Sequence, residues 1–139
     1  METRTELEWT QRAHALGKIF AERASAHDGD DAFVHENYAE LKEEGFTAAL
    51  IPVECGGGGV SHALMCDLLR ILGSYCGSTA LALSMHQHLL AAAVWRLRHG
   101  QGGEAMLRKV AEKRLILVST GAQDWLASNG IAERSNGGY

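Results

Sequence analysis

The sequence predicts a mainly α-helical fold: an orthogonal bundle of about five helices, followed by the first strand of an incomplete β-domain. Apolar residues recur at steps of three and four over most of residues 1–113. Glycine-rich breaks divide these stretches into helices of ordinary length. After Lys113 the pattern changes to a continuous β-type apolar run. We therefore expect an α-helical domain at 1–113 and the start of a β-domain at 114–139.

Composition narrows the class of protein. Hydrophobic residues make up 46% and charged residues 22% of the chain, as in soluble proteins that bury a core. A net charge of −4 gives no electrostatic reason to bind nucleic acid or an anionic membrane. The three cysteines lack CxxC spacing, which favours a reduced, cytoplasmic setting. Cys66 and Cys76 fall in an apolar helical pattern, so we expect both to be buried as small hydrophobes.

The first predicted helix begins near Thr5, because Thr5 and Glu8 have the spacing of a capping box. The polar run at 26–31 ends this helix. A shorter helix follows at about 33–41, with Gly45 at its C′ position. The apolar stripe of the first helix comprises Trp9, Ala13, Leu16, Phe20 and Ala24.

A joint rich in proline and glycine separates these helices from the next ones. Residues 46–51 are interpreted as an extended segment that leads into Pro52 and the glycines at 56–59. Proline cannot continue a helix and glycine admits positive φ, so the chain can turn sharply here. A glycine-rich loop before a helix can also bind phosphate through its N–H groups. The lysine of a P-loop and the GxGxxG order are absent, so we interpret the joint as structural.

Three further helices follow the joint. Ser61 is the predicted N-cap of the third helix. After a break at 77–78, the fourth helix spans about 79–99 and is the most apolar stretch of the chain. We expect it to lie at the centre of the bundle, in contact on nearly all faces. Gly100 ends it, and a short fifth helix follows.

Polar groups near the fourth helix and the strand are candidate site residues. His86 and His88 point about 200° apart on a helix, so they cannot chelate one metal ion, and no metal site is predicted. One of them can face a ligand pocket, or be a buried histidine bonded to a backbone carbonyl. Ser119 and Thr120 end the strand, where a ligand can dock, although an ordinary strand end is favoured. No nucleophile–base pair follows from spacing.

After the predicted strand at 115–118, the sequence predicts only loops and at most a second strand near 130–133. A single strand is not stable alone, because its N–H and C=O groups need a partner. We therefore expect the chain to be a fragment of a longer protein, with an unpaired apolar strand that invites aggregation.

The order of these pieces resembles the N-terminal part of the acyl-CoA dehydrogenase family. Residues 41–46 (LKEEGF) and 51–61 (IPVECGGGGVS) look like that family's "L…eGf…vPeeyGGxGxs" signature. STALALSMH at 78–86, Gly100, and GGY at 137–139 also fit. The resemblance runs from about residue 5 to the last residue.

The resemblance implies an enzyme of three parts: a helical domain, a middle β-domain and a C-terminal four-helix bundle that forms a tetramer. Such enzymes bind FAD and oxidise acyl-CoA thioesters, with a carboxylate removing the α-proton and the flavin accepting the β-hydride. The carboxylate belongs to the C-terminal part, so no catalytic residue is assigned here. We expect neither acyl-CoA oxidation nor stoichiometric FAD from this chain alone.

The resemblance also assigns site residues. It gives flavin contacts to Leu117, Ser119 and Thr120. It gives substrate contacts to Ser84, Met85 and His88, at the end of the acyl chain, and to Ser128, near the thioester.

Two departures from the family pattern leave other functions open. The family commonly has Thr-Glu-Pro after the first strand, where this chain has Thr-Gly-Ala at 120–122. Its "GSD" turn is replaced by ASNG at 127–130. One alternative is a flavin-dependent monooxygenase of the same fold. Another, from a different class, is a non-catalytic α-helical binding or assembly module.

Overall fold

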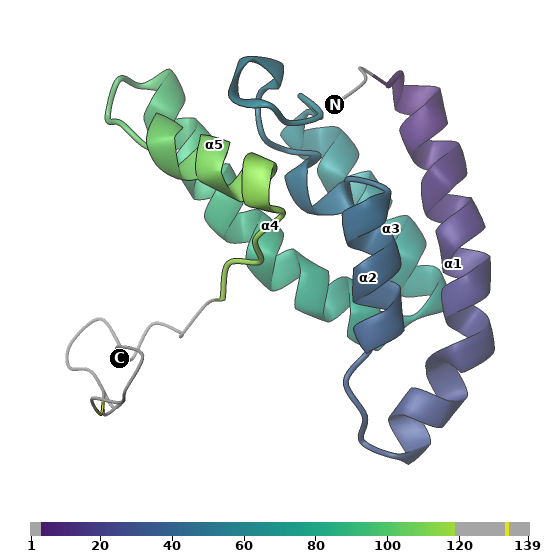
Figure 1. Cartoon of the computed structure of the whole chain (residues 1–139). Coiled ribbons are helices and arrows are strands. Elements are labelled where there is room, and N and C mark those ends of the chain that lie inside the picture. The colour runs from purple at the N-terminus through teal and green to yellow at the C-terminus, as the bar shows by residue number, and fades with distance from the viewer. Residues whose placement is uncertain (1–3, 119–132, 134–139) are drawn as a thin grey trace.

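The computed structural model describes residues 4–118 and residue 133. This part of the chain forms five α-helices and two short 3-10 helices, which confirms the predicted helical bundle. The elements are α1 (Glu6–Gly29), α2 (His35–Glu43), η1 (Phe46–Ala48), η2 (Val53–Cys55), α3 (His62–Tyr75), α4 (Gly77–Arg98) and α5 (Glu104–Lys113). In Figure 1, α1 stands along one side of the molecule, and α4 crosses to the other side, where α5 lies against it.

The helix α1 starts with the predicted capping box. The Glu8 N–H donates to the Thr5 hydroxyl at 3.2 Å, and the Thr5 N–H donates to the Glu8 carboxylate at 2.7 Å. Each bond satisfies an N–H group that a helix start leaves unpaired. The helix packs chiefly against α3, and a Cβ on Gly17 would lie 2.2 Å from the Tyr75 ring. Only glycine therefore allows this close helix crossing.

The prediction of an extended segment at 46–51 is wrong. Gly45 takes its predicted place after α2, with a φ of 78° and its N–H bonded to the Lys42 carbonyl. The chain then coils into η1 and a further turn, because the Ala48 N–H bonds to Gly45 and the Ile51 N–H bonds to Ala48. These bonds span three residues and replace the partner strand that an extended segment needs.

The proline- and glycine-rich joint is structural, as predicted. The N–H groups of the four glycines at 56–59 all donate to backbone carbonyls, so none of them is left for a phosphate. A Cβ on Gly57 would lie 2.1 Å from the Ile51 carbonyl oxygen, and Gly56 has a φ of 88°. Position 57 thus requires glycine because another part of the backbone approaches closely, and position 56 favours glycine because its φ is positive.

A single residue connects α3 to α4. Ser61 caps α3 as predicted, accepting from the Leu64 N–H at 3.1 Å. The break predicted at Gly77 and Ser78 is wrong, because both already belong to α4. The turn is made by Cys76, whose extended φ of −148° and ψ of 103° are open to any residue. The turn between α3 and α4 therefore needs no glycine.

The predicted burial of α4 on nearly all faces is also wrong. Its inner face is buried, but Leu81, Met85 and Trp95 are 68%, 42% and 53% exposed. Cys66 on α3 is likewise exposed, whereas Cys76 is buried as predicted. The inner, buried residues of α4 are Thr79, Ala80, Leu83, His86, Gln87, Leu90, Ala93 and Val94.

The segment after α5 packs on the helices, and no strand is formed at 115–118. Leu115, Ile116 and Leu117 lie half-buried against the core, and Val118 is 79% exposed. The expectation of an unpaired strand is therefore corrected for residues 115–117, because the helical domain partly covers them. The remainder of the predicted β-domain lies outside the described residues.

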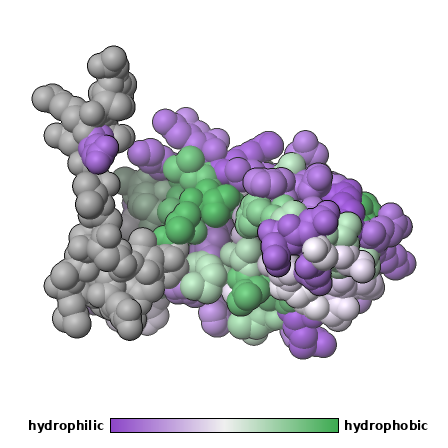
Figure 2. Space-filling model, turned by 90° about the horizontal axis from the view of Figure 1, so that it is seen from below, coloured by the Kyte–Doolittle hydropathy of each residue, from purple (hydrophilic) through white to green (hydrophobic). Residues whose placement is uncertain are grey.

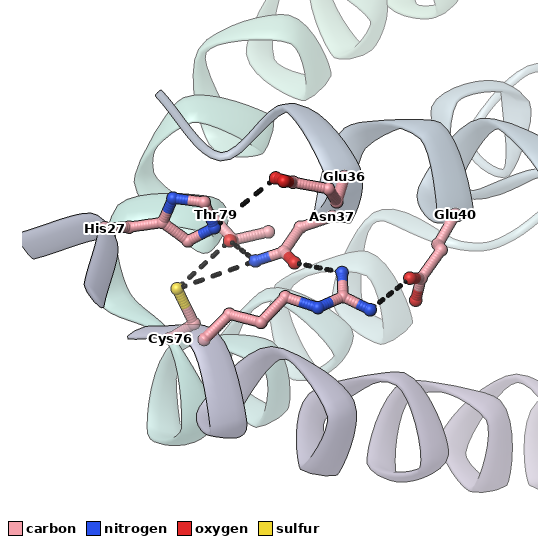
Figure 3. A network of polar contacts seen from close by, with 7 residues as sticks. His27, Glu36, Asn37, Glu40, Cys76 and Thr79 are labelled. Atoms are coloured by element: carbon pink, nitrogen blue, oxygen red, sulfur yellow. Dashed lines mark hydrogen bonds and ion pairs between the residues drawn. The ribbon is translucent and has the colours of Figure 1, made fainter. Parts of the chain in front are cut away.

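A chain of polar contacts fastens α1, α2 and the start of α4 together (Figure 3). Arg23 donates to the Asn37 side-chain oxygen at 3.0 Å. The Asn37 amide nitrogen donates to the Thr79 hydroxyl at 2.8 Å, and that hydroxyl donates to the Cys76 sulfur at 3.1 Å. Arg23 also pairs with Glu40 at 2.6 Å. Because Asn37 and Thr79 each accept one bond and donate another, the successive bonds polarise one another and strengthen the chain.

Candidate functional site

The surface of α4 is hollowed where it meets α3 and, beyond His62, where it meets Leu50 and Val60; we call this surface the α3–α4 groove. It consists of two hollows of about 240 and 450 Å³ that share His62. The smaller hollow is lined by His62, Met65, Cys66, Leu69, Ser84, Gln87 and His88. The larger one is lined by Leu50, Val60, His62, Ala91, Ala92, Val94, Trp95, Arg98 and His99. Hydrophobic side chains line most of both hollows, and each hollow also carries polar groups: Ser84, Gln87 and His88 in the smaller one, and Arg98 and His99 in the larger one.

Two of the three substrate contacts assigned to α4 meet in this groove. Ser84 and His88 lie one helical turn apart and both line the smaller hollow. The Ser84 hydroxyl donates to the Leu81 carbonyl at 2.7 Å, so its oxygen remains free to accept. Met85 is not among the lining residues, because the next position on a helix points about 100° away.

Sequence reasoning missed Gln87. It is buried within α4, and its amide nitrogen donates to the Phe46 carbonyl at 2.9 Å. Its side-chain oxygen has no hydrogen-bond partner among the described residues. A glutamine in the middle of an apolar helix was the signal that could have identified it, since a buried amide needs partners.

His86 lies on the other side of α4 and is fully buried. Its Nε2 is 2.7 Å from the Thr47 carbonyl oxygen, and its Nδ1 is 3.0 Å from the Leu117 backbone nitrogen. Burial lowers the pKa of His86 below its ordinary value of 6.5, against the opposing effect of the Thr47 bond, and the nearby charge of Lys42 lowers it further. Of the two sequence interpretations, the histidine bonded to a backbone carbonyl is confirmed for His86.

The assigned flavin contacts are described only at Leu117. Its N–H is bonded to His86, so its carbonyl and side chain are the groups left for a ligand. Ser119, Thr120 and Ser128 lie outside the described residues. Figure 2 shows hydrophobic surface near the middle of the face seen from below, flanked by hydrophilic surface.

Other reactive groups in the described residues offer little chemistry. Cys55 lines a charged cleft of about 560 Å³ beside Arg108, but burial raises the pKa of its thiol. A protonated thiol is a poor nucleophile. Within residues 4–118 and 133, no cluster of three histidine, cysteine or carboxylate side chains has the arrangement of a metal site. The same part of the chain has no helix with the length and hydropathy needed to cross a membrane.

Comparison with known proteins agrees with this architecture. The family model described as "Acyl-CoA dehydrogenase, N-terminal domain" matches residues 2–114, which is most of the chain. The chain belongs to the acyl-CoA dehydrogenase family. The match ends where α5 gives way to the segment at 115–118, so it coincides with the helical bundle.

A curated relative adds a second finding. Over 137 residues the chain is 31% identical to the "pigment production hydroxylase" of Rhodococcus sp. (strain ATCC 21145). The similarity covers 99% of this chain and 33% of that protein, so the chain spans about one third of the relative's length. No solved structure matches the chain.

Proposed function

We propose that this chain forms the helical wall of the substrate pocket in a flavin-dependent hydroxylase of the acyl-CoA dehydrogenase family. The observation that carries the proposal is the similarity to the Rhodococcus hydroxylase, which extends over 99% of the chain. It includes the residues after 118, where the departures from the dehydrogenase pattern lie. In this proposal the helical domain ends near residue 113, and a β-domain begins at 114.

The α3–α4 groove supports a role in substrate binding. Its larger hollow suits an apolar body, since hydrophobic side chains line most of it. Ser84, His88 and Gln87 at the smaller hollow can orient a polar group of the substrate by hydrogen bonds. We assign Met85 to the exposed face beside the groove, where it would meet another part of the complete enzyme.

The segment at 115–118 supports a role in holding the flavin, FAD in most of the family. The Leu117 carbonyl can accept from the edge of an isoalloxazine ring, and the exposed Val118 offers an apolar edge beside it. Ser119 and Thr120 would supply the hydroxyl contacts. The flavin, when bound, supplies the electron transfer to the substrate or to oxygen that side chains cannot perform. The chain's own part is to exclude water and orient the substrate.

A second candidate is dehydrogenation of an acyl-CoA thioester, in a homotetramer of the complete enzyme. The family match over residues 2–114 favours it, because that helical domain is named for such enzymes. The same groove would then hold the end of the acyl chain, with Ser128 near the thioester. Three free cysteine side chains are consistent with a cytoplasmic location for either enzyme.

A domain exchange tests these candidates. Residues 1–114 of this chain would replace the matching helical domain of the Rhodococcus hydroxylase, with the unaltered hydroxylase as the control. We expect the chimera to bind flavin and to restore pigment formation in cells that lack the hydroxylase. Binding of acyl-CoA to the chimera, but not to the unaltered hydroxylase, would instead identify a dehydrogenase wall. A folded chimera without pigment formation, without acyl-CoA binding and without flavin would favour the non-catalytic binding or assembly module.

A further inference from the structure

His86 joins three elements that are distant in sequence. Through Nε2 it contacts Thr47 of η1, 39 residues earlier, and through Nδ1 it contacts Leu117, 31 residues later. The imidazole is fully buried, so water does not compete for either bond. The side chain therefore links the segment at 115–118 to the core of the helical domain.

The chemistry of the two partners fixes the protonation state of the ring. A carbonyl oxygen only accepts, so Nε2 must carry a proton in the contact with Thr47. A backbone N–H only donates, so Nδ1 must offer a lone pair to Leu117. Both bonds form together only in the neutral imidazole that is protonated at Nε2.

We propose that His86 is a positioning residue whose neutral imidazole holds the Leu117 backbone against the helical domain. The hold itself follows from the contacts of His86. The role of the contact between His86 and Leu117 in placing a flavin rests on the proposed function.

Protonation reverses the hold. If Nδ1 also carried a proton, two donors, the Nδ1–H and the Leu117 N–H, would point at each other. The hydrogen bond between His86 and Leu117 would then be lost. The charged neighbour that acts on the ring is Lys42 of α2, which opposes protonation, while η1 and the segment at 115–118 contribute backbone groups. On α4 itself, His88 lies on the exposed surface, away from the buried ring. The Leu117 backbone is therefore bonded to His86 at neutral pH and loses this bond in acid.

Hydrogen exchange on the 139-residue chain tests the hold. We expect the protection of the Leu117 amide, corrected for its intrinsic exchange rate, to fall about tenfold in His86→Gln. Glutamine reaches the Thr47 carbonyl but puts no acceptor at the Nδ1 position. His86→Asn is the matched variant, because its side-chain oxygen takes the place of Nδ1 and keeps the bond to Leu117. The Leu115 amide, bonded to the Val110 carbonyl at 3.1 Å, is the internal control.

The pH profile separates a proton-controlled hold from simple packing. In the native chain, Leu117 protection should fall on acidification while Leu115 protection stays constant, and in His86→Asn both should stay constant. Nitrogen NMR of the native imidazole should show a protonated Nε2 and a bare Nδ1 at neutral pH. A proton on Nδ1, or equal protection of Leu117 in the native chain and His86→Gln, would overturn the proposal. These readouts need no flavin, so failure of the chimera would leave them unchanged.

Discussion

The two longest helices, α1 and α4, differ in which kinds of side chain they bury and expose. α1 buries the apolar Trp9, Leu16 and Phe20 and, apart from Arg23, turns most of its charged residues to solvent. α4 buries Thr79, His86 and Gln87 among its inner residues, while large apolar side chains of its outer face are exposed. The partners of α1 lie within the described chain, whereas α4 presents a second apolar surface that the described residues leave open. An open apolar face rimmed by polar groups is typical of a binding surface.

The buried polar groups of α4 explain its unusual inner face. Thr79 bonds to Asn37 of α2, and Gln87 bonds to the carbonyl of Phe46 in η1. Together with His86, they attach three other segments to one helix. The inner face of α4 thus specifies position through hydrogen bonds, while the inner face of α1 supplies apolar burial.

The largest predicted effect is on the inner face of α1. Phe20→Ala should lower the free energy of unfolding by about 3–5 kcal/mol, because a fully buried ring is removed and leaves a cavity. Urea denaturation measures the change. Ile19→Ala, at a neighbouring site that is 39% exposed, is the control and should cost less than about 1 kcal/mol. Similar losses for both variants would show that the α1 stripe is not the core.

A smaller loss is expected from the inner face of α4. Thr79→Val keeps the shape of the side chain but removes the hydroxyl that accepts from Asn37. The free energy of unfolding should fall by about 1–3 kcal/mol, since a buried amide donor loses its partner. Ser78→Ala removes an exposed hydroxyl one position away and should change stability by less than about 0.5 kcal/mol. The attachment role of α4 fails if the two variants behave alike in denaturation.

The pH dependence of stability sharpens the comparison further. Because the folded pKa of His86 is lowered, the unfolded chain takes up a proton that the folded chain refuses. His86 should therefore leave stability unaffected above pH 6.5 and reduce it progressively as the pH falls from there through the lowered pKa. Thermal unfolding of the native chain and His86→Asn between pH 5 and pH 7 measures this contribution. A difference between the two that does not vary with pH would contradict it.

The smallest effect on folding is predicted for the outer face of α4. Leu81→Gln should change the free energy of unfolding by less than about 0.5 kcal/mol, because Leu81 is already 68% exposed. Self-association, measured by sedimentation, should decrease as apolar surface is removed. Leu90→Ala on the inner face is the contrasting variant and should cost about 2–5 kcal/mol. A strongly destabilising Leu81→Gln would mean that the outer face is covered.

The same contrast explains which parts of the fold could be predicted. The polar residues of α1 face solvent, so a single apolar stripe and the Thr5 cap identified both its inner face and its start. α4 is apolar on both sides, so periodicity predicted a helix but could not tell its inner face from its outer one. The turn at Cys76 was missed because it uses neither glycine nor proline, the residues by which turns are recognised. η1 was missed because the glycine before it, Gly45, was already explained as the end of α2.

The candidate site was predictable only in part, for a related reason. Family resemblance identified Ser84 and His88, which line the same hollow, but it also included Met85, which does not. The role of His86 depends on contacts 39 and 31 residues away, and no local pattern contains them. Gln87 was hidden in the same way, because its partner is a carbonyl of another element.

Cys76 alone connects α3 to α4, so it is the pivot at which the angle between the two helices is set. At 1.5 Å per residue, the 22 residues of α4 extend roughly 33 Å from this pivot, so a rotation of about 10° would move the far end by roughly 6 Å. Asn37 and Thr79 brace the pivot itself, through bonds that reach back to Arg23. The bonds of Asn37 and Thr79 thus fix the start of α4, while α5 and η1 contact the helix as well. A change in the angle at Cys76 would shift Trp95, which lines the larger hollow, without any contact to Trp95 itself.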